Sequence, residues 1–206
     1  MTAEPLPDLG PQRLRSRQKE QTREYILEAA TLVFAEKGYA DSTIDDITTA
    51  AGASRATLYA HFPGKEAVLA EIIKRMMSEV QVLYASFSGL DEWSRPTIRR
   101  WVTHFALAWQ RDATRNKIAT QAALPQLAQL RLPLQKQLIK HLRSRGELWG
   151  HFTPNEADAR ASMIVNLLQG EFPDFFFNNE RGGEAEFIDY ITDGLRDLLR
   201  ADAAKS

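Results

Sequence analysis

One segment of this 206-residue chain, residues 42–69, constrains its fold more than any other. Thr43 is placed to cap a short helix, because its side-chain oxygen can accept from free backbone amides, and Asp46 three residues later completes a capping box. Gly52 ends that helix where a left-handed backbone costs glycine little. Ser54 then caps a second helix. The segment therefore predicts two helices joined by a tight turn, a helix-turn-helix.

The second of these helices has two different faces. Leu58 and Phe62 lie four residues apart and are expected to point inward. Arg55 is the strongest candidate for reading a base, because its planar fork can donate two hydrogen bonds to a guanine edge. No acidic residue is expected on the outward face, whose arginine, hydroxyls, aromatic ring and histidine can donate to DNA. We expect this face to contain Arg55, Ala56, Thr57, Tyr59, Ala60 and His61.

Lys65 opens a third helix, after Pro63 and Gly64. A lysine is locally unfavourable at a helix N-terminus, where the macrodipole already presents positive charge. A phosphate lying against that terminus would explain the placement, since free amides and the ammonium would then share one anion. We therefore expect Lys65 to contact a phosphate.

The run Thr57-Leu58-Tyr59, followed by His61-Phe62 and Lys65-Glu66, resembles the DNA-binding domain of the tetracycline-repressor (TetR) family. The resemblance covers about residues 23–69 and implies a repressor that binds a double-stranded DNA operator. It also implies that the cap threonine, the tyrosine, the histidine and the lysine hold phosphates, and that the residues after the capping serine read bases. The DNA-binding residues expected on this basis are Thr43, Ser54, Arg55, Ala56, Thr57, Tyr59, His61 and Lys65.

Other interpretations remain open at this point. Tyr59 alone fits a half-buried packing residue, and His61 alone fits a helix C-terminal cap. The helix-turn-helix could also serve as a protein–protein module without DNA. The chain has no metal-binding spacing, no glycine-rich phosphate loop and no nucleophile signature, so no catalytic residue, metal or cofactor is expected. If the protein were an enzyme, the only candidates for catalytic residues would be His104, His141, Glu147, His151 and Glu171.

Apolar residues recur at helical spacing along the chain without long alternating runs, which predicts an all-α fold. The first helix is expected over about 23–37, and the helix from Lys65 is expected to continue to about Phe87. We predict a flexible basic arm over residues 1–20, a helix-turn-helix domain over 21–68, and a helical ligand-binding and dimerisation domain over 69–206. The arm carries basic residues at positions 13, 15, 17 and 19, which either follow DNA or are simply solvated.

The resemblance implies a ligand cavity in the second domain, where an aromatic-rich helical stripe supplies candidates for its wall. Aromatic rings with a few amides suit an apolar or flat aromatic small molecule, and Glu171 would attract a cation if it pointed inward. For each wall residue the alternative is ordinary core packing. The expected wall consists of Trp101, His104, Phe105, Trp109, Gln121, Met163, Asn166 and Phe172.

The last two expected helices, about 155–177 and 184–199, are apolar on more than one side, so they predict a four-helix homodimer interface. The alternative is that they serve only the core of one chain. A dimer would place two reading helices about 34 to 36 Å apart, on a palindromic operator. The chain contains no cysteine, signal peptide or membrane-spanning run, so we expect a cytoplasmic protein. The resemblance further implies a regulator that a ligand releases from DNA.

Overall fold

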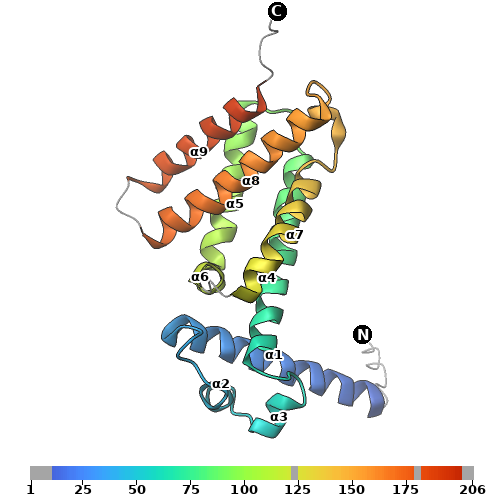
Figure 1. The fold of residues 1–206 in the computed structure, drawn as a ribbon, viewed down its shortest axis with the longest axis vertical. Helices are drawn as coiled ribbons and strands as arrows, with labels where there is room; N and C mark the ends of the chain where they lie inside the picture. The colour runs from blue at the N-terminus through green and yellow to red at the C-terminus, as the bar shows by residue number, and fades with distance from the viewer. Residues whose placement is uncertain (1–10, 122–124, 179–181, 201–206) are drawn as a thin grey trace, which may run out of the picture. The chain divides into compact units, whose positions relative to one another are not determined.

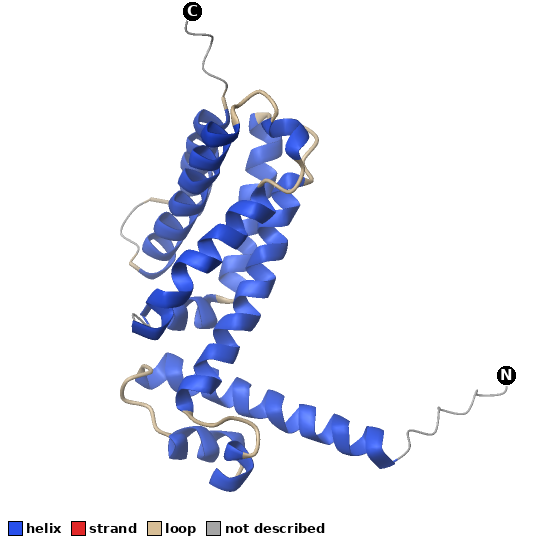
Figure 2. Ribbon diagram, turned by 45° about the vertical axis from the view of Figure 1, so that its right-hand side comes forward, coloured by secondary structure: helices blue, strands red, loops and turns tan. Residues whose placement is uncertain are grey.

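The computed structural model describes residues 11–121, 125–178 and 182–200, with side chains over 13–118, 133–178 and 182–200. Every regular element in these ranges is a helix, as Figures 1 and 2 show, which confirms the all-α prediction. The chain divides into two compact units, residues 1–72 and 73–206.

The first unit contains α1 (Pro11–Lys37), α2 (Ile44–Ala51), α3 (Arg55–Tyr59) and the beginning of α4 (Lys65–Ser88). Helix α1 starts at Pro11 rather than near residue 23, so residues 11–20 of the predicted flexible arm are helical. This part has no apolar stripe, but its arginine, lysine, glutamine and glutamate residues are good helix formers. They extend a helix that is already nucleated by the packed residues that follow.

The core of the first unit unites α1, the two helices of the helix-turn-helix and the first turns of α4. Arg23 closes one side of it: its guanidinium carbon lies 4.9 Å from the ring centroid of Phe62, and its Nη2 lies 3.2 Å from a carboxylate oxygen of Glu71. The apolar side chains that are at most 3 % exposed here are Ile26, Ala30, Phe34, Ile47, Leu58, Phe62, Val68, Leu69 and Ile72.

Lys65, the first residue of α4, ties this helix to the loop that follows α1. Its ammonium donates to the backbone carbonyl oxygens of Tyr39 at 2.7 Å, Ala40 at 3.3 Å and Ser42 at 2.7 Å. The same nitrogen lies 4.4 Å from the centroid of the Tyr39 ring. A lysine ammonium has three donors, and all three are used here. The loop carbonyls therefore give the ammonium partners within the protein, and its contact with a phosphate stays a prediction.

Replacement of Lys65 by Met should lower the free energy of unfolding by about 2 kcal/mol, because part-buried carbonyl oxygens lose a charged donor. Urea denaturation followed by circular dichroism would measure this loss. The matched control is Lys74→Met, an exposed lysine of the same helix, which should change the free energy of unfolding by less than about 0.5 kcal/mol. Equal stability of the two variants would contradict the structural role of Lys65.

The second unit consists of the rest of α4 with α5 (Arg95–Arg111), α6 (Ala113–Gln121), α7 (Pro125–Leu142), the short 3₁₀ helix η1 (Gly146–Trp149), α8 (Pro154–Phe177) and α9 (Glu184–Leu199). Helix α9 packs on α5 and α8, and α8 also packs on α6 and α7 (Figure 1). Pro133 lies inside α7, which begins at Pro125. The helix continues past this proline because Leu138 and Leu142 are fully buried.

Aromatic rings fill the centre of the second unit. Phe172 of α8 is fully buried, and its ring centroid lies 4.8 Å from that of Phe105 and 5.1 Å from that of Phe187. Trp101 extends the cluster, with its ring centroid 5.2 Å from that of Phe105. Tyr84 of α4 contacts both α5 rings edge to face. Edge contacts of this kind add to the burial of large apolar surfaces, so α4, α5, α8 and α9 share one core.

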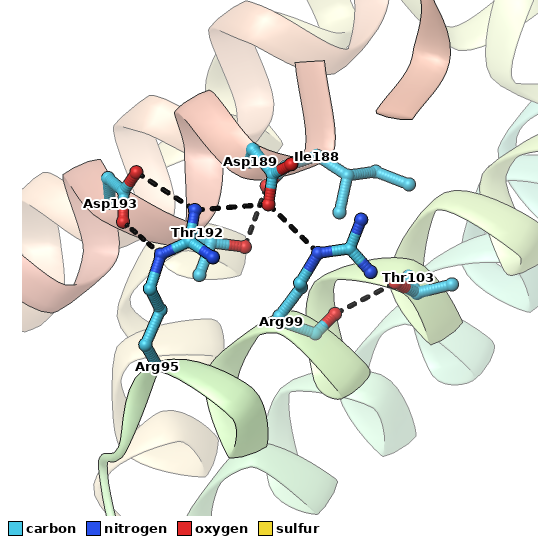
Figure 3. A network of polar contacts seen from close by, with 7 residues as sticks. All are labelled: Arg95, Arg99, Thr103, Ile188, Asp189, Thr192 and Asp193. Atoms are coloured by element: carbon cyan, nitrogen blue, oxygen red, sulfur yellow. Dashed lines mark hydrogen bonds and ion pairs between the residues drawn. The ribbon is translucent and has the colours of Figure 1, made fainter. Parts of the chain in front are cut away.

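A chain of ion pairs joins the surface of α5 to that of α9 (Figure 3). Arg95 donates through Nε to Asp193 at 2.8 Å and through Nη2 to Asp189 at 3.1 Å. Arg99 donates through Nε to the same oxygen of Asp189 at 2.8 Å. Hydrogen bonds from these arginines hold the pKa of both carboxyl groups below the ordinary range. A surface network of several charges is the arrangement in which exposed ion pairs contribute measurably.

Because both carboxyl groups have a lowered pKa in the folded state, the stability from this network should be present above their unfolded pKa of about 3.9 and lost as the pH falls below it. The thermal midpoint of the wild type should therefore decrease more steeply between about pH 5 and 3 than that of an Asp189→Asn/Asp193→Asn double variant. The control is Asp91→Asn, an exposed carboxylate outside the network, which should follow the wild-type curve. Parallel curves for wild type and double variant would show that the network contributes nothing.

Candidate nucleic-acid interface

The first helix of the motif begins as predicted. Thr43 Oγ1 accepts from the backbone N–H of Asp46 at 3.1 Å, and Asp46 Oδ2 accepts from the backbone N–H of Thr43 at 2.9 Å. Lys37, the last residue of α1, places its Nζ 2.5 Å from Asp46 Oδ1. The hydrogen bond from Lys37, followed by those from Thr43, lowers the pKa of Asp46 to about 2. Thr43 Oγ1 also donates to Asp46, so a phosphate contact by this hydroxyl stays a prediction.

The turn between α2 and α3 also forms as predicted. Gly52 adopts a left-handed backbone with φ 60° and ψ 30°, and its N–H returns to the carbonyl oxygens at the end of α2. Ser54 Oγ accepts from the backbone N–H of Thr57 at 3.0 Å and lies 2.8 Å from the Thr57 hydroxyl. The two hydroxyl groups therefore fix the first turn of α3, and Ser54 acts first as a cap. A direct contact of Ser54 with DNA remains a prediction.

Helix α3 presents most of the predicted outward face to solvent. Arg55, Ala56, Tyr59 and Ala60 are exposed, whereas Thr57 is half-buried. Leu58, by contrast, is fully buried, as its spacing predicted. The Tyr59 side chain is 54 % exposed, which does not fit the alternative of a packing residue. The small side chains of Ala56 and Ala60 leave room beside Tyr59 for a close approach to a groove.

His61 follows the end of α3 and is half-buried. Its Nδ1 is buried and has no hydrogen-bond partner among the described residues. A phosphate contact would therefore have to use the other ring nitrogen, Nε2. Its role as a phosphate ligand stays a prediction.

Arg55 makes a contact that the sequence did not suggest. Its Nε donates to Asp45 Oδ1 and its Nη2 to Asp45 Oδ2, so the two side chains form a two-bond ion pair between α2 and α3. The hydrogen bond from Arg55 lowers the pKa of Asp45, and the same bond raises the pKa of Arg55. Helix α3 itself carries no acidic residue, as expected, but α2 places the Asp45 carboxylate beside its first side chain. The only sequence signal was an exposed acid in the first turn of α2, which alone predicts favourable helix-dipole charge and nothing more.

The helical extension at the start of α1 carries the basic residues of the predicted arm. Residues 13–21 are all exposed, and Leu14 among them is 50 % exposed. The basic residues of this extension are Arg13, Arg15, Arg17 and Lys19. A helix without an apolar contact face presents its charges to solvent from every side, which suits a phosphate backbone as well as water.

The members of the predicted effector wall differ in their exposure. Trp101, Phe105 and Phe172 are buried and packed against one another in the core. Three other members of the wall are exposed and point away from that core, because α5 and α8 bury their opposite faces: His104, Met163 and Asn166. Trp109 is half-buried against the α8 phenylalanines, and the side chain of Gln121 lies outside the described residues.

A cavity of about 490 Å³ lies elsewhere in the second unit, at the end of α8 and the start of α9. Glu171, which the sequence analysis singled out as a group that would attract a cation if it pointed inward, lines this cavity beside aromatic rings from both helices. The sequence missed the α9 side of this cavity because helix periodicity does not show where two helix ends diverge. Its lining consists of Glu171, Asp174, Phe175, Asn178, Gly182, Glu186, Phe187 and Tyr190.

Among the described residues, no group of three or more His, Asp or Glu side chains could hold a metal ion. In the same ranges, none of the helices has the length and apolar character needed to cross a membrane.

Comparison with known proteins gives one family and several relatives. Residues 26–72 match the family model of bacterial regulatory proteins of the tetR family. The chain is 36 % identical over 84 residues to the transcriptional repressor DhaR of Mycobacterium sp. (strain GP1), which covers 41 % of each protein. It is 32 % identical over 114 residues to the repressor KstR2 of Rhodococcus jostii (strain RHA1), covering 50 % of this chain and 55 % of KstR2. The similarity thus spans about two fifths to half of these relatives.

Solved structures extend the likeness of the fold to nearly the whole chain. A protein described as a TetR-family transcriptional regulator from Syntrophomonas wolfei superimposes with a TM-score of 0.74 at 16 % identity, covering 92 % of this chain and all of that one. Another from Mesorhizobium loti gives a TM-score of 0.68 at 18 % identity, covering 88 % and 96 % of the two chains. At such identities the likeness concerns the fold. Residues 26–72 are thus similar to the DNA-binding part of the tetR family of bacterial regulatory proteins, and nearly the whole chain shares its fold with solved structures described as TetR-family regulators.

Proposed function

We propose that this protein is a DNA-binding transcriptional regulator, a repressor that binds a palindromic operator as a homodimer and leaves it when a small molecule binds. The observation that carries this proposal is the exposed face of α3, which offers a guanidinium, a tyrosine hydroxyl and small residues at the tip of a capped helix-turn-helix. The relatives DhaR and KstR2, both named as repressors, support it. All the named relatives are regulators, which weighs against an enzyme.

The contacts that we propose differ in their tasks. Arg55, Ala56 and Thr57 lie directly after the Ser54 cap, where a recognition helix brings its first residues to base edges. Thr43, Tyr59, His61 and the basic extension of α1 hold phosphates in this proposal. A phosphate contact by Lys65 would require its ammonium to exchange one of the three loop carbonyls for the phosphate.

For the homodimer we propose the outward faces of α8 and α9. Much of the apolar surface that predicted this interface is used within the chain, since Ile164, Val165 and Leu168 are buried. What remains outside includes Met163, 54 % exposed, and Tyr190, 64 % exposed. Two helices from each of two protomers would bury this face as a four-helix bundle.

The effector that we propose is an apolar or aromatic small molecule that binds in the second unit. An apolar or aromatic molecule is supported by the density of rings in the second unit, where a ligand would exchange ring contacts with Trp101, Phe105 or Phe172. Helix α4 begins in the first unit and ends in the second, so a ligand-induced shift of this helix would reach both.

Selection of duplexes from a random DNA library by the wild-type protein should enrich a two-fold symmetric sequence with half-site centres about 34 to 36 Å apart. Arg55→Ala should lower the affinity for that sequence by about 1–3 kcal/mol and remove the preference at one base pair per half-site, while binding to random DNA changes much less. Electrophoretic mobility shift or fluorescence anisotropy titration would measure both affinities.

The charge-matched control is Arg111→Ala, an exposed arginine at the end of α5, which should bind the selected sequence like the wild type. Equal losses on selected and random DNA would refute base reading by Arg55. If the wild type enriched no sequence at all, the regulator proposal would fail, and the protein–protein alternative for the helix-turn-helix would gain support.

The dimer proposal predicts that Met163→Arg/Tyr190→Arg gives a monomer, because like charges would then meet across the two-fold axis. Both side chains are exposed in the protomer, so the fold should survive the change. Sedimentation velocity at micromolar concentration would show the wild type as a dimer and the double variant as a monomer with weakened operator binding. The control Leu107→Arg, at a 49 % exposed leucine of α5, should remain dimeric. A wild-type monomer, or a dimeric double variant, would contradict the proposed interface.

A further inference from the structure

The ion pair between Asp45 and Arg55 lies on the surface that the proposed function turns toward DNA. Asp45 is the second residue of α2, and Arg55 is the first residue of α3. Their side chains are 57 % and 66 % exposed, so neither is held by burial. The tight turn at Gly52 and the cap at Ser54 bring two helix beginnings together across ten residues of sequence.

The carboxylate occupies one particular edge of the guanidinium. Asp45 accepts from Nε and from one hydrogen of Nη2, which is the side-on edge of the Arg55 fork. A guanidinium carries five N–H donors in one plane, so the end-on edge, formed by Nη1 and the second hydrogen of Nη2, stays available. Two parallel donors on one edge are what the O6 and N7 acceptors of guanine require. The pair thus fixes the plane of Arg55 and leaves a complete two-donor fork.

A role in stabilising the fold does not by itself explain the ion pair between Asp45 and Arg55. Exposed ion pairs contribute little to stability, because water screens the charges and both side chains lose rotamer freedom. The α2–α3 arrangement already has its own fastening in the Gly52 turn, the Ser54 cap and the buried Leu58. A carboxylate close to a DNA-binding face also repels phosphates, so its presence there opposes indiscriminate binding. These features fit a role in selectivity.

We propose that Asp45 is a positioning residue for sequence recognition: it holds the Arg55 guanidinium in the orientation that reads a guanine, and it lowers binding to DNA without that base. The inference rests on the proposed function, since it requires that α3 faces DNA. An arginine held in place before binding loses less conformational freedom in the complex than a free one, which strengthens the correct contact. The same carboxylate weakens complexes in which no base accepts from the Arg55 guanidinium, because its repulsion of DNA phosphates is then not offset by a base contact.

The test compares wild type, Asp45→Ala and the charge-matched control Asp41→Ala, which removes another exposed carboxylate near the motif. The probes are the duplex selected by the wild type, duplexes with each half-site position changed singly, and random DNA. Asp45→Ala should reduce the preference for guanine at the position lost in Arg55→Ala by about fivefold, the range expected from immobilising one long side chain. Preferences at the other positions should stay as they are, and binding to random DNA should rise as in Asp41→Ala.

The dependence on Arg55 is tested in the double variant Asp45→Ala/Arg55→Ala. There the loss of Asp45 should leave the base preferences of Arg55→Ala unchanged, because no guanidinium remains to be positioned. Thermal unfolding of all variants should show that Asp45→Ala melts within a few degrees of the wild type, about the shift expected for an exposed pair.

Three results would overturn the inference. An unchanged guanine preference in Asp45→Ala would show that Arg55 needs no positioning. An increased preference would show that Asp45 competes with the base for Arg55. A uniform loss at every position together with a lower melting temperature would show a purely structural tie. A wild-type protein that selects no sequence would instead refute the proposed function itself, so the two failures are distinguishable.

Discussion

The burial of Leu58 and Phe62 in the core of the first unit is the interaction on which the exposed face of α3 depends. Helix α3 has five residues, far fewer than an isolated helix needs to persist in water. Its direction is therefore set by these two side chains, which are 0 % and 3 % exposed, and by the Ser54 cap at its start. Because the inward face is fixed, the outward face is fixed as well, and Arg55 and Tyr59 lie toward solvent.

Charged side chains complete this arrangement from the outside. Lys65 holds three carbonyl oxygens of the loop after α1, Arg23 covers the ring of Phe62, and Lys37 holds the capping carboxylate of Asp46. The contacts of Lys65 and Lys37 satisfy polar groups that the short loops leave without helical partners, whereas Arg23 covers an apolar ring. Three cations of the first unit thus contact groups of the protein itself. The position of a basic residue in a motif does not by itself assign it to phosphate.

The helix caps and the turn of the motif were predictable from the sequence, whereas the contacts between side chains distant in the sequence were not. Thr43, Gly52 and Ser54 were identified because caps and left-handed turns depend on residues at most three positions away. The carbonyl partners of Lys65 were missed because they lie more than twenty residues earlier, and Asp45 was overlooked because only the folded turn brings it to Arg55. In the second unit, periodicity correctly placed Phe105 and Phe172 on inward faces, but it could not separate a packed core from a cavity wall.

The sequence by itself determined the helical class, the family resemblance and the helix-turn-helix, because short-range spacing encodes which residues cap, turn and face inward. Tertiary structure decided which polar groups meet: the carbonyls around Lys65, the carboxylate beside Arg55, and the Arg95, Asp189 and Asp193 contacts between α5 and α9. It also decided that the aromatic stripe fills the core. The physical reason is that hydrogen bonds and ring contacts require a few ångströms in space, a distance that sequence spacing specifies only within one turn or one helix.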